Sequence, residues 1–233
     1  SCGFNQIVNN LAKLNYRWGE AADVVIRMPA GGGMSAGPFH SQSNEAWFFH
    51  IPGLKIVYPS NPYDAKGLLM AAFDDPNPVL YFEHKGLYRS LTESVPAAPY
   101  LIPIGQAKLC RDGGRAGIIT YGMGVSVAME AVRKHDWDVA VLDLRSLMPL
   151  DLEAISQLVM KTHRILILHE DTLTGGIGAE ISAYISQHLF QYLDAPVTRL
   201  ASLDTPIPFA ANLEKQFMPW DRLGKEIESL LAY

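Results

Sequence analysis

The chain has 233 residues, with 19 Lys and Arg against 24 Asp and Glu, a formal net charge of −5 and 48% hydrophobic residues. This composition excludes intrinsic disorder, which needs fewer aliphatic residues and more net charge, and the length is that of one or two domains. Because Lys and Arg form no cluster, we expect neither nucleic acid nor an anionic membrane as a partner.

The beginning of the chain alternates helical and strand patterns. Apolar residues spaced three and four apart predict an amphipathic helix, and β-branched runs stopped by Pro29 and Pro59 predict buried parallel strands. Asn61 and Pro62 are a helix start signal. The expected elements are a helix over 5–17, a strand over 23–28, a Gly/Ser-rich loop over 30–43, a short aromatic helix over 44–50, a strand over 54–58, a helix after Pro62 that turns Leu68, Leu69, Ala72 and Phe73 inward, and a strand over 79–83.

Prolines at 96, 99 and 103 make 84–106 the best candidate for a linker, because proline fits neither a central strand nor a helix interior. Strands then alternate with helices, which is typical of right-handed βαβ crossovers and of a sheet covered on both faces. The expected elements are strands over 116–121, 139–143, 165–169 and 197–201 and helices over 125–135, 152–160, 178–190 and 222–231.

We therefore predict two α/β units, over 1–90 and 108–233, joined by a linker over 91–107. The second unit has enough strands for a complete domain. The first starts on a helix and ends near Glu83, and a parallel sheet of so few strands is marginal. The pattern thus predicts that part of the first domain is absent from the chain.

The cysteines indicate a reducing environment. Cys2 and Cys110 are far apart and have no His or Cys at ligand spacing, so neither a disulfide framework nor a zinc site is expected. No apolar run reaches the length of a membrane span, and the amino terminus has no signal or transit pattern. We expect a cytoplasmic protein.

The Gly-rich loop carries the candidate catalytic histidine, His40, beside Ser41 and Gln42. A loop between a strand and the following helix lies at the carboxyl ends of the strands, where open α/β sheets bind ligands. The loop matches neither GxGxxG nor the P-loop, so it is a weak phosphate site. His40 either exchanges protons near neutral pH or hydrogen-bonds a backbone carbonyl that fixes the turn, and the residues alone leave both roles open.

Structural roles are favoured for the other candidate motifs. His169 beside Glu170 favours a buried hydrogen-bonded pair over a role in a site. The glycines within residues 174–178 favour a tight turn with close helix packing over an anion-binding site. The glycines within residues 122–124 leave the same two interpretations open. No GxSxG elbow and no side-chain metal motif occurs. The remaining histidines need no chemical role to explain them. Those at helix ends or in connections are His50, His84, His135 and His163, and the one within a helix is His188.

Six segments, taken together and in order, resemble a known family. They are PAGGGMSAGPFHSQSNEAWFFHIPGLKIVYPSNPYDAKGLL, DDPNPVLYFEHKGLYR, ITYGMGVSVAMEA, DLRSLMPLD, HEDTLTGGIGAEI and YLDAPVTRLASLDTPIPFA. The chain is similar to the beta subunit of the thiamine-diphosphate-dependent decarboxylating component of 2-oxo acid dehydrogenase complexes. The resemblance implies a pyrimidine-binding domain, here truncated, with a parallel sheet, followed by a complete transketolase C-terminal-like α/β domain.

The resemblance also implies a division of the cofactor site. The family's glutamate that activates the aminopyrimidine, and the aromatic residue that packs on it, belong upstream of Phe4 and outside this chain. The diphosphate and magnesium belong to the alpha subunit or an alpha-like half. His40 matches the family histidine that faces the active site and assists acyl transfer to the lipoyl group. A monovalent cation, potassium, would be held by the backbone carbonyls of Ala22, Val24, Val25, Ala72, Asp75 and Asn77.

The resemblance implies oxidative decarboxylation of a 2-oxo acid with acyl transfer to lipoyl-lysine. The expected substrate is a branched-chain 2-oxo acid of the 2-oxoisovalerate type, with pyruvate as the alternative. The expected partners are an alpha subunit, a second beta copy and the lipoyl acyltransferase component, and the chain alone is expected to be inactive. A non-catalytic interaction module that keeps the fold is the rival from another class, and a thiamine-family synthase such as transketolase is a more distant one.

Overall fold

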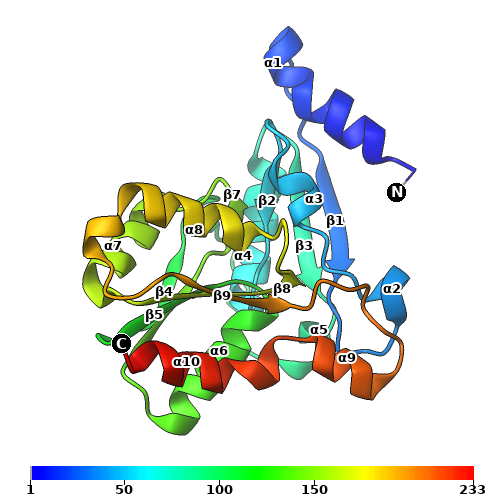
Figure 1. Ribbon diagram of the computed structural model, residues 1–233. Coiled ribbons are helices and arrows are strands. Elements are labelled where there is room, and N and C mark those ends of the chain that lie inside the picture. Colours follow the sequence, from blue (N-terminus) through cyan, green and yellow to red (C-terminus); the bar gives the residue numbers. More distant parts are fainter. Residues whose placement is uncertain (1) are drawn as a thin grey trace.

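The computed structural model describes residues 2–233, which fold around two sheets (Figure 1). The first sheet has the strand order β1-β3-β2-β7 and the second has the order β4-β6-β5-β8-β9. Each sheet is mostly parallel, with one antiparallel strand at an edge: β7 pairs antiparallel with β2, and β4 with β6. The predicted arrangement of two α/β units with mostly parallel strands is confirmed.

The first sheet contains a proline where the sequence predicted a strand end. Pro29 lies inside β1 and is aligned with Glu83 of β3. The prediction that Pro29 stops the strand was wrong, because β1 is an edge strand and proline is tolerated there. The strands of this sheet are β1 (Val25–Ala30), β2 (Lys55–Val57), β3 (Val79–His84) and β7 (Ser146–Met148).

The second sheet is covered by helices on both faces (Figure 1), as parallel strands require. Its strands are β4 (Lys108–Arg111), β5 (Ala116–Thr120), β6 (Val139–Asp143), β8 (Ile165–Thr172) and β9 (Thr198–Ser202). Helices α7 (Leu152–Thr162) and α8 (Ile177–His188) pack on one face, and α6 (Met123–His135) and α10 (Leu223–Leu231) pack on the other.

The first sheet has one longer helix and several short ones. Helix α4 (Pro62–Asp74) begins at Asn61, whose side chain accepts a hydrogen bond from Asp64 N as predicted for a cap. Leu68 and Ala72 of α4 are buried, but Phe73 is exposed, so the prediction that Phe73 points inward was wrong. The short helices of the first unit are α2 (Gly37–His40), α3 (Ala46–Phe49) and α5 (Leu87–Ser90), and a further short helix, α9 (Ala211–Phe217), belongs to the carboxyl-terminal part of the chain.

The predicted amino-terminal helix is present but is irregular. It runs as a π-helical turn (Gln6–Asn10), a 3₁₀ turn (Leu11–Lys13) and α1 (Leu14–Trp18), and it ends at Gly19 in the left-handed conformation. In Figure 1 this segment projects away from the sheets. It contacts the rest of the molecule mainly through the buried side chains of Val8 and Ala12.

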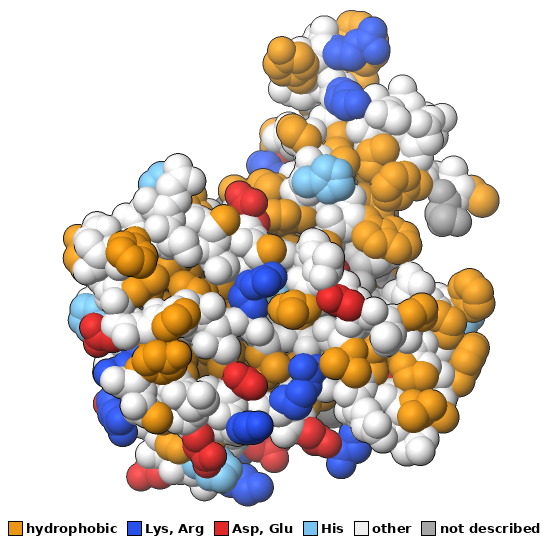
Figure 2. Space-filling model, in the orientation of Figure 1, with side chains coloured by type: hydrophobic (Ala, Val, Ile, Leu, Met, Phe, Trp, Pro, Cys, Tyr) orange, Lys and Arg blue, Asp and Glu red, His pale blue; other side chains and the backbone are white. Residues whose placement is uncertain are grey.

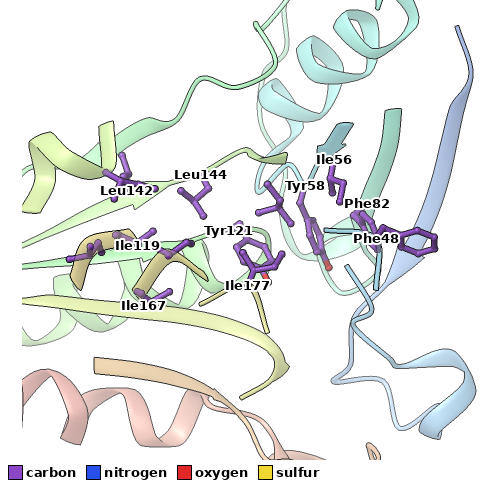
Figure 3. Packing of buried hydrophobic residues seen from close by; sticks show 14 of the residues in the cluster. Phe48, Ile56, Tyr58, Phe82, Ile119, Tyr121, Leu142, Leu144, Ile167 and Ile177 are labelled. Atoms are coloured by element: carbon purple, nitrogen blue, oxygen red, sulfur yellow. The ribbon is translucent and has the colours of Figure 1, made fainter. Parts of the chain in front are cut away.

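The main core lies between the two sheets. Phe48, Phe82 and Tyr58 from the first unit continue into Tyr121 and Ile119 of the second in one buried cluster (Figure 3). Aromatic rings bridge the units, because Tyr58 lies 5.5 Å from Tyr121 between ring centroids. The far face of each sheet has its own smaller core. The two units are therefore held by shared apolar burial as well as by the chain connection.

Strand β7 crosses the predicted division of the chain. It belongs to the stretch 108–233, yet it pairs with β2 of the first sheet. The second unit thus supplies the last strand of the first sheet. The boundaries 1–90, 91–107 and 108–233 stay a prediction.

Candidate active site

The Gly-rich loop between β1 and α3 adopts a conformation that depends on left-handed residues. Gly31, Gly33, Ser35 and Gly37 have φ values of 93°, 84°, 53° and 71°. Gly31 N donates a hydrogen bond to Gln42 O (3.2 Å), which joins the two ends of the loop. A chain reversal of this kind favours glycine, because an L side chain rarely adopts positive φ.

His40 is exposed at the end of the short helix α2, within this loop. Its neighbour Phe39 is 83% exposed, whereas Ser41 is buried. The imidazole therefore stands at the surface while the residue after it anchors the loop. The predicted catalytic role of His40 stays a prediction, and its exposed position is compatible with that role.

Glu170 of β8 holds both ends of the loop. Its Oε1 accepts hydrogen bonds from Gly32 N (2.7 Å) and from Ser43 Oγ (2.9 Å), and its Oε2 lies 2.7 Å from His84 Nε2. Gly86 N donates to His84 Nδ1 (3.1 Å), so Nε2 carries the proton that His84 donates to Glu170. Burial raises the pKa of Glu170, but His84 and the hydrogen bonds outweigh burial and hold this pKa below its ordinary value.

Glu214 of α9 holds the middle of the loop. Its Oε1 accepts a hydrogen bond from Gly33 N (2.9 Å), and its Oε2 accepts hydrogen bonds from Ser35 N (2.8 Å) and Ser35 Oγ (3.4 Å). Glu214 is only 3% exposed. A buried carboxylate that accepts several N–H and O–H bonds orders the groups that donate to it.

The loop glycines also make room for side chains that pack against them. A Cβ on Gly32 would lie 2.1 Å from Met218 Cε, and a Cβ on Gly37 would lie 2.2 Å from the Phe209 ring. On Gly31 it would lie 2.3 Å from the His84 ring. These glycines therefore serve close packing, mainly against the carboxyl-terminal part of the chain.

Two cavities flank the loop. One, of about 650 Å³, is lined mainly by apolar and aromatic side chains that include Phe4, Met28, Phe39 and Trp47. The other, of about 160 Å³, is lined by Ser41, Ser43, Glu170, Asp171 and other side chains. Gln42 and Trp47 border both cavities. Figure 2 shows hydrophobic side chains gathered over α2 and α9, where Phe39 and Phe209 are exposed.

A second buried polar cluster lies where the units meet. Tyr121 OH donates to Glu45 Oε1 (2.6 Å), and Glu45 Oε2 has no partner among the described residues. Burial, together with the nearby charge of Asp171, raises the pKa of Glu45 to about 8. Burial also raises the pKa of Asp171 to about 6, although N–H groups of Thr172 and Ala46 oppose this shift.

His169 lies in this region and is fully buried. Its Nδ1 donates to the Asp171 carbonyl (3.1 Å), and burial lowers its pKa to about 4, so the ring is neutral. The predicted buried hydrogen-bonded role is thus found, with Asp171 rather than Glu170 as the partner. Gly176 and Gly178 serve close packing, because a Cβ on either would lie within 3 Å of the His169 ring, whereas a Cβ on Gly175 would meet nothing within 4 Å.

Sequence reasoning missed His84, Glu170 and Glu214 as neighbours of the loop. The interpretation of His84 as an ordinary connection residue was wrong, because it is buried and paired with Glu170. The sequence signal for Glu170 was its place at the end of a strand. Nothing in the sequence pattern placed α9, and with it Glu214, beside a loop about 180 residues away.

The six positions predicted to hold a monovalent cation gather near the start of β1 and the end of α4. Ala22 N donates to Pro76 O (2.8 Å), which joins these two segments. The Ala22 and Val24 carbonyls each accept a backbone N–H, and the Asp75 carboxylate is bonded to Lys55 and Asn77. No group of three or more His, Cys, Asp or Glu that could hold a metal occurs within residues 2–233. The cation site stays a prediction.

Comparisons with known proteins agree with this architecture. Residues 3–90 match the family of the transketolase pyrimidine binding domain, and residues 105–222 match the family of the transketolase C-terminal domain. A solved structure titled "Split gene transketolase, inactive beta4 tetramer" superposes with a TM-score of 0.77 at 19% identity, covering 100% of this chain and 72% of that one. This likeness shows the fold.

Curated relatives are more similar in sequence. The chain is 47% identical to the 2-oxoisovalerate dehydrogenase subunit beta of Bacillus subtilis, over 92% of this chain and 67% of the relative. It is 49% identical to the pyruvate dehydrogenase E1 component subunit beta of Porphyra purpurea, over 91% and 65%. It is 42% identical to the mitochondrial 2-oxoisovalerate dehydrogenase subunit beta of Dictyostelium discoideum, over 97% and 62%. The chain thus spans 62 to 67% of the length of these three relatives.

No helix over residues 2–233 is long and apolar enough to cross a bilayer. The cytoplasmic location stays a prediction, since one of these relatives is mitochondrial.

Proposed function

This chain belongs to the family of beta subunits of 2-oxo acid dehydrogenases, and from this premise we propose that it forms part of an enzyme that oxidatively decarboxylates a 2-oxo acid and transfers the acyl group to lipoyl-lysine. The family supports the role of an oxidoreductase component that works with an alpha subunit. A second beta copy and a lipoyl acyltransferase component complete the proposed set of partners.

The position of His40 is the observation that carries the proposal. The imidazole is exposed on a loop whose backbone is held by buried carboxylates. Its neighbours Phe39 and Gln42 line the cavity of about 650 Å³. An exposed proton donor on a fixed loop beside an apolar cavity is what catalysis by positioning requires.

Thiamine diphosphate, the cofactor of this family, does not fit the residues of this chain as a whole. The large cavity offers apolar and aromatic walls, and Arg27 is its one charged lining residue among those described. These walls can contact the face of a heterocycle, but no lining carboxylate can activate an aminopyrimidine. We therefore assign no cofactor contact to this chain. The activating acid, the diphosphate site and magnesium would come from the upstream polypeptide and the alpha part.

His40 would act in acyl transfer. When a carbon nucleophile that carries the acyl unit attacks one sulfur of the lipoyl ring, its electron pair forms the C–S bond, the S–S bond breaks, and the other sulfur leaves with the S–S electron pair as a thiolate that takes up a proton. A group within hydrogen-bond reach of that sulfur lowers the barrier by supplying the proton. In this proposal the His40 side chain donates that proton.

A branched-chain 2-oxo acid of the 2-oxoisovalerate type is the proposed substrate, and pyruvate is the alternative. Relatives with both names match at similar identity, 47% and 49%. The two substrates differ in the size of their apolar side chain, so the pocket wall contributed by the missing parts would decide between them. Parallel assays with 2-oxoisovalerate and pyruvate distinguish them.

The test is reconstitution of the 233-residue chain with the complementary upstream polypeptide and an alpha subunit. We expect no 2-oxo acid turnover from the chain alone with thiamine diphosphate and magnesium, and turnover after reconstitution. His40→Ala should slow lipoyl acylation by about 100-fold or more, the size of a general-acid contribution. His50→Ala, which changes another exposed histidine, is the matched control.

Two results would contradict the proposal. Turnover by the chain alone would show that it holds a complete site. Partner binding without turnover after reconstitution would favour a non-catalytic interaction module that keeps the fold.

A further inference from the structure

We propose that Glu170 and Glu214 are positioning residues for His40, so that the carboxyl-terminal unit sets where the imidazole stands. Both carboxylates come from elements downstream of residue 160, and both bind backbone N–H groups of the loop that carries His40. The effect on acyl transfer rests on the proposed function, whereas the effect on the loop does not.

The two carboxylates bind different parts of the loop. Glu170 binds Gly32 N at one end and Ser43 Oγ at the other, which closes the loop across its base. Glu214 binds Gly33 N and Ser35 N, which fixes the turn before α2. Helix α2 follows directly, so the backbone that carries His40 is held on both sides of the helix.

The exposed turn over residues 33–35 has few restraints besides the hydrogen bonds to Glu214. Gly33 is open, with nothing within 4 Å of a built Cβ, and residues 33–35 are exposed at the surface. Three glycines of the loop and Ser35 have positive φ, so the loop conformation has no strong local preference to maintain it. Charge-assisted hydrogen bonds from buried acceptors are among the stronger restraints available to such a segment.

The packing against the loop comes from the same part of the chain as the two carboxylates. Met218 and Ile207 lie against Gly32, and Phe209 lies against Gly37. The stretch 207–218 therefore supplies both apolar contacts and a carboxylate. A shift of this stretch relative to the first sheet would move the loop and His40 with it.

The test is amide hydrogen exchange in Glu214→Gln, measured on the 233-residue chain. A glutamine keeps one acceptor oxygen but places an NH₂ group beside the second N–H, so at least one hydrogen bond is lost. We expect exchange at Gly33 and Ser35 to accelerate by about tenfold or more. Exchange at Ile118 and Ile119 in the buried strand β5 should stay unchanged.

Two further variants complete the test. Glu228→Gln makes the same charge change on the exposed face of α10 and should leave the loop unaffected. Glu214→Asp keeps the charge but shortens the side chain by one methylene, so it tests the same bonds if Glu214→Gln does not fold.

Unchanged exchange at Gly33 and Ser35 would overturn the proposal. Equal acceleration across β5 would also overturn it, because Glu214 would then stabilise the fold as a whole. In the reconstituted enzyme, Glu214→Gln should slow lipoyl acylation, whereas Glu228→Gln should leave it near the wild-type rate. If the wild type itself shows no turnover, the proposed function fails while the exchange result still decides the positioning role.

Discussion

Glu45 is a carboxyl that the fold keeps protonated at neutral pH. Its pKa is raised to about 8 by burial and by Asp171, against about 4.5 in the unfolded chain. Between these two values the unfolded state loses the proton while the folded state keeps it. Stability therefore falls as pH rises from about 4.5 to about 8, and this loss is complete above that range.

Glu45→Gln should remove this dependence. The amide oxygen can still accept the hydrogen bond from Tyr121 OH, and the side chain no longer ionises. We expect the decline in the free energy of unfolding between pH 6 and pH 9 to become shallower than in the wild type. Urea titrations at both pH values measure it, and an unchanged slope would contradict the assignment to Glu45.

Asp64 and Arg145 form a buried ion pair between the two units. Arg145 donates from Nε and Nη2 to the two carboxylate oxygens, at 3.0 and 2.6 Å. The Asp64 side chain is 0% exposed and the Arg145 side chain is 13% exposed. Asp64→Ala would leave a nearly buried guanidinium unpaired, which typically lowers stability by about 3 to 5 kcal/mol.

The matched control for this prediction is Arg27→Ala. Arg27 pairs with Glu83 through a similar geometry, but its side chain is 59% exposed. Water screens such a pair, so Arg27→Ala should lower the free energy of unfolding much less than Asp64→Ala does. Denaturant midpoints of the two variants provide the comparison. Equal losses of stability would contradict the prediction that the buried pair contributes more than the exposed one.

At the scale of elements, the amino-terminal helix packs closely against the backbone at Gly53. This residue has φ of 97°, and a Cβ there would lie 1.8 Å from the Ala12 carbonyl oxygen. Gly53→Ala should therefore displace the helix, because the new Cβ and the Ala12 carbonyl oxygen cannot both keep their positions. Cleavage by trypsin after Lys13 and Arg17 should become several-fold faster.

Gly19→Ala separates this clash from backbone strain. Gly19 also has positive φ, 71°, but a Cβ there meets nothing within 4 Å. Both variants carry the cost of a left-handed alanine, about 1 to 2 kcal/mol. Only Gly53→Ala should expose the helix to protease, and equal cleavage in both would show that strain alone accounts for the effect.

At the scale of the whole molecule, the two units should unfold together. One buried cluster joins Phe82 and Tyr58 of the first unit to Tyr121 and Ile119 of the second, and β7 completes the first sheet from the second half of the chain. We expect a single thermal transition, with equal calorimetric and van't Hoff enthalpies. Two separate transitions would show that the shared core contributes little.

The sequence determined the order and the type of most elements. Apolar periodicity and the cap at Asn61 mark helices that the structure contains, and β-branched runs mark the central strands. The sequence also indicated His40 as a candidate site residue, because His40 lies in a Gly-rich loop. These features could be predicted because they depend on local spacing and on backbone preference.

The tertiary structure alone decided the surroundings of that histidine. Strands β4 and β7 were missed because each is short and forms only by pairing with a distant strand. Glu170 and Glu214 reach the loop from residues more than 130 positions away. Such contacts depend on how the two sheets pack, and no local pattern of residues encodes that packing.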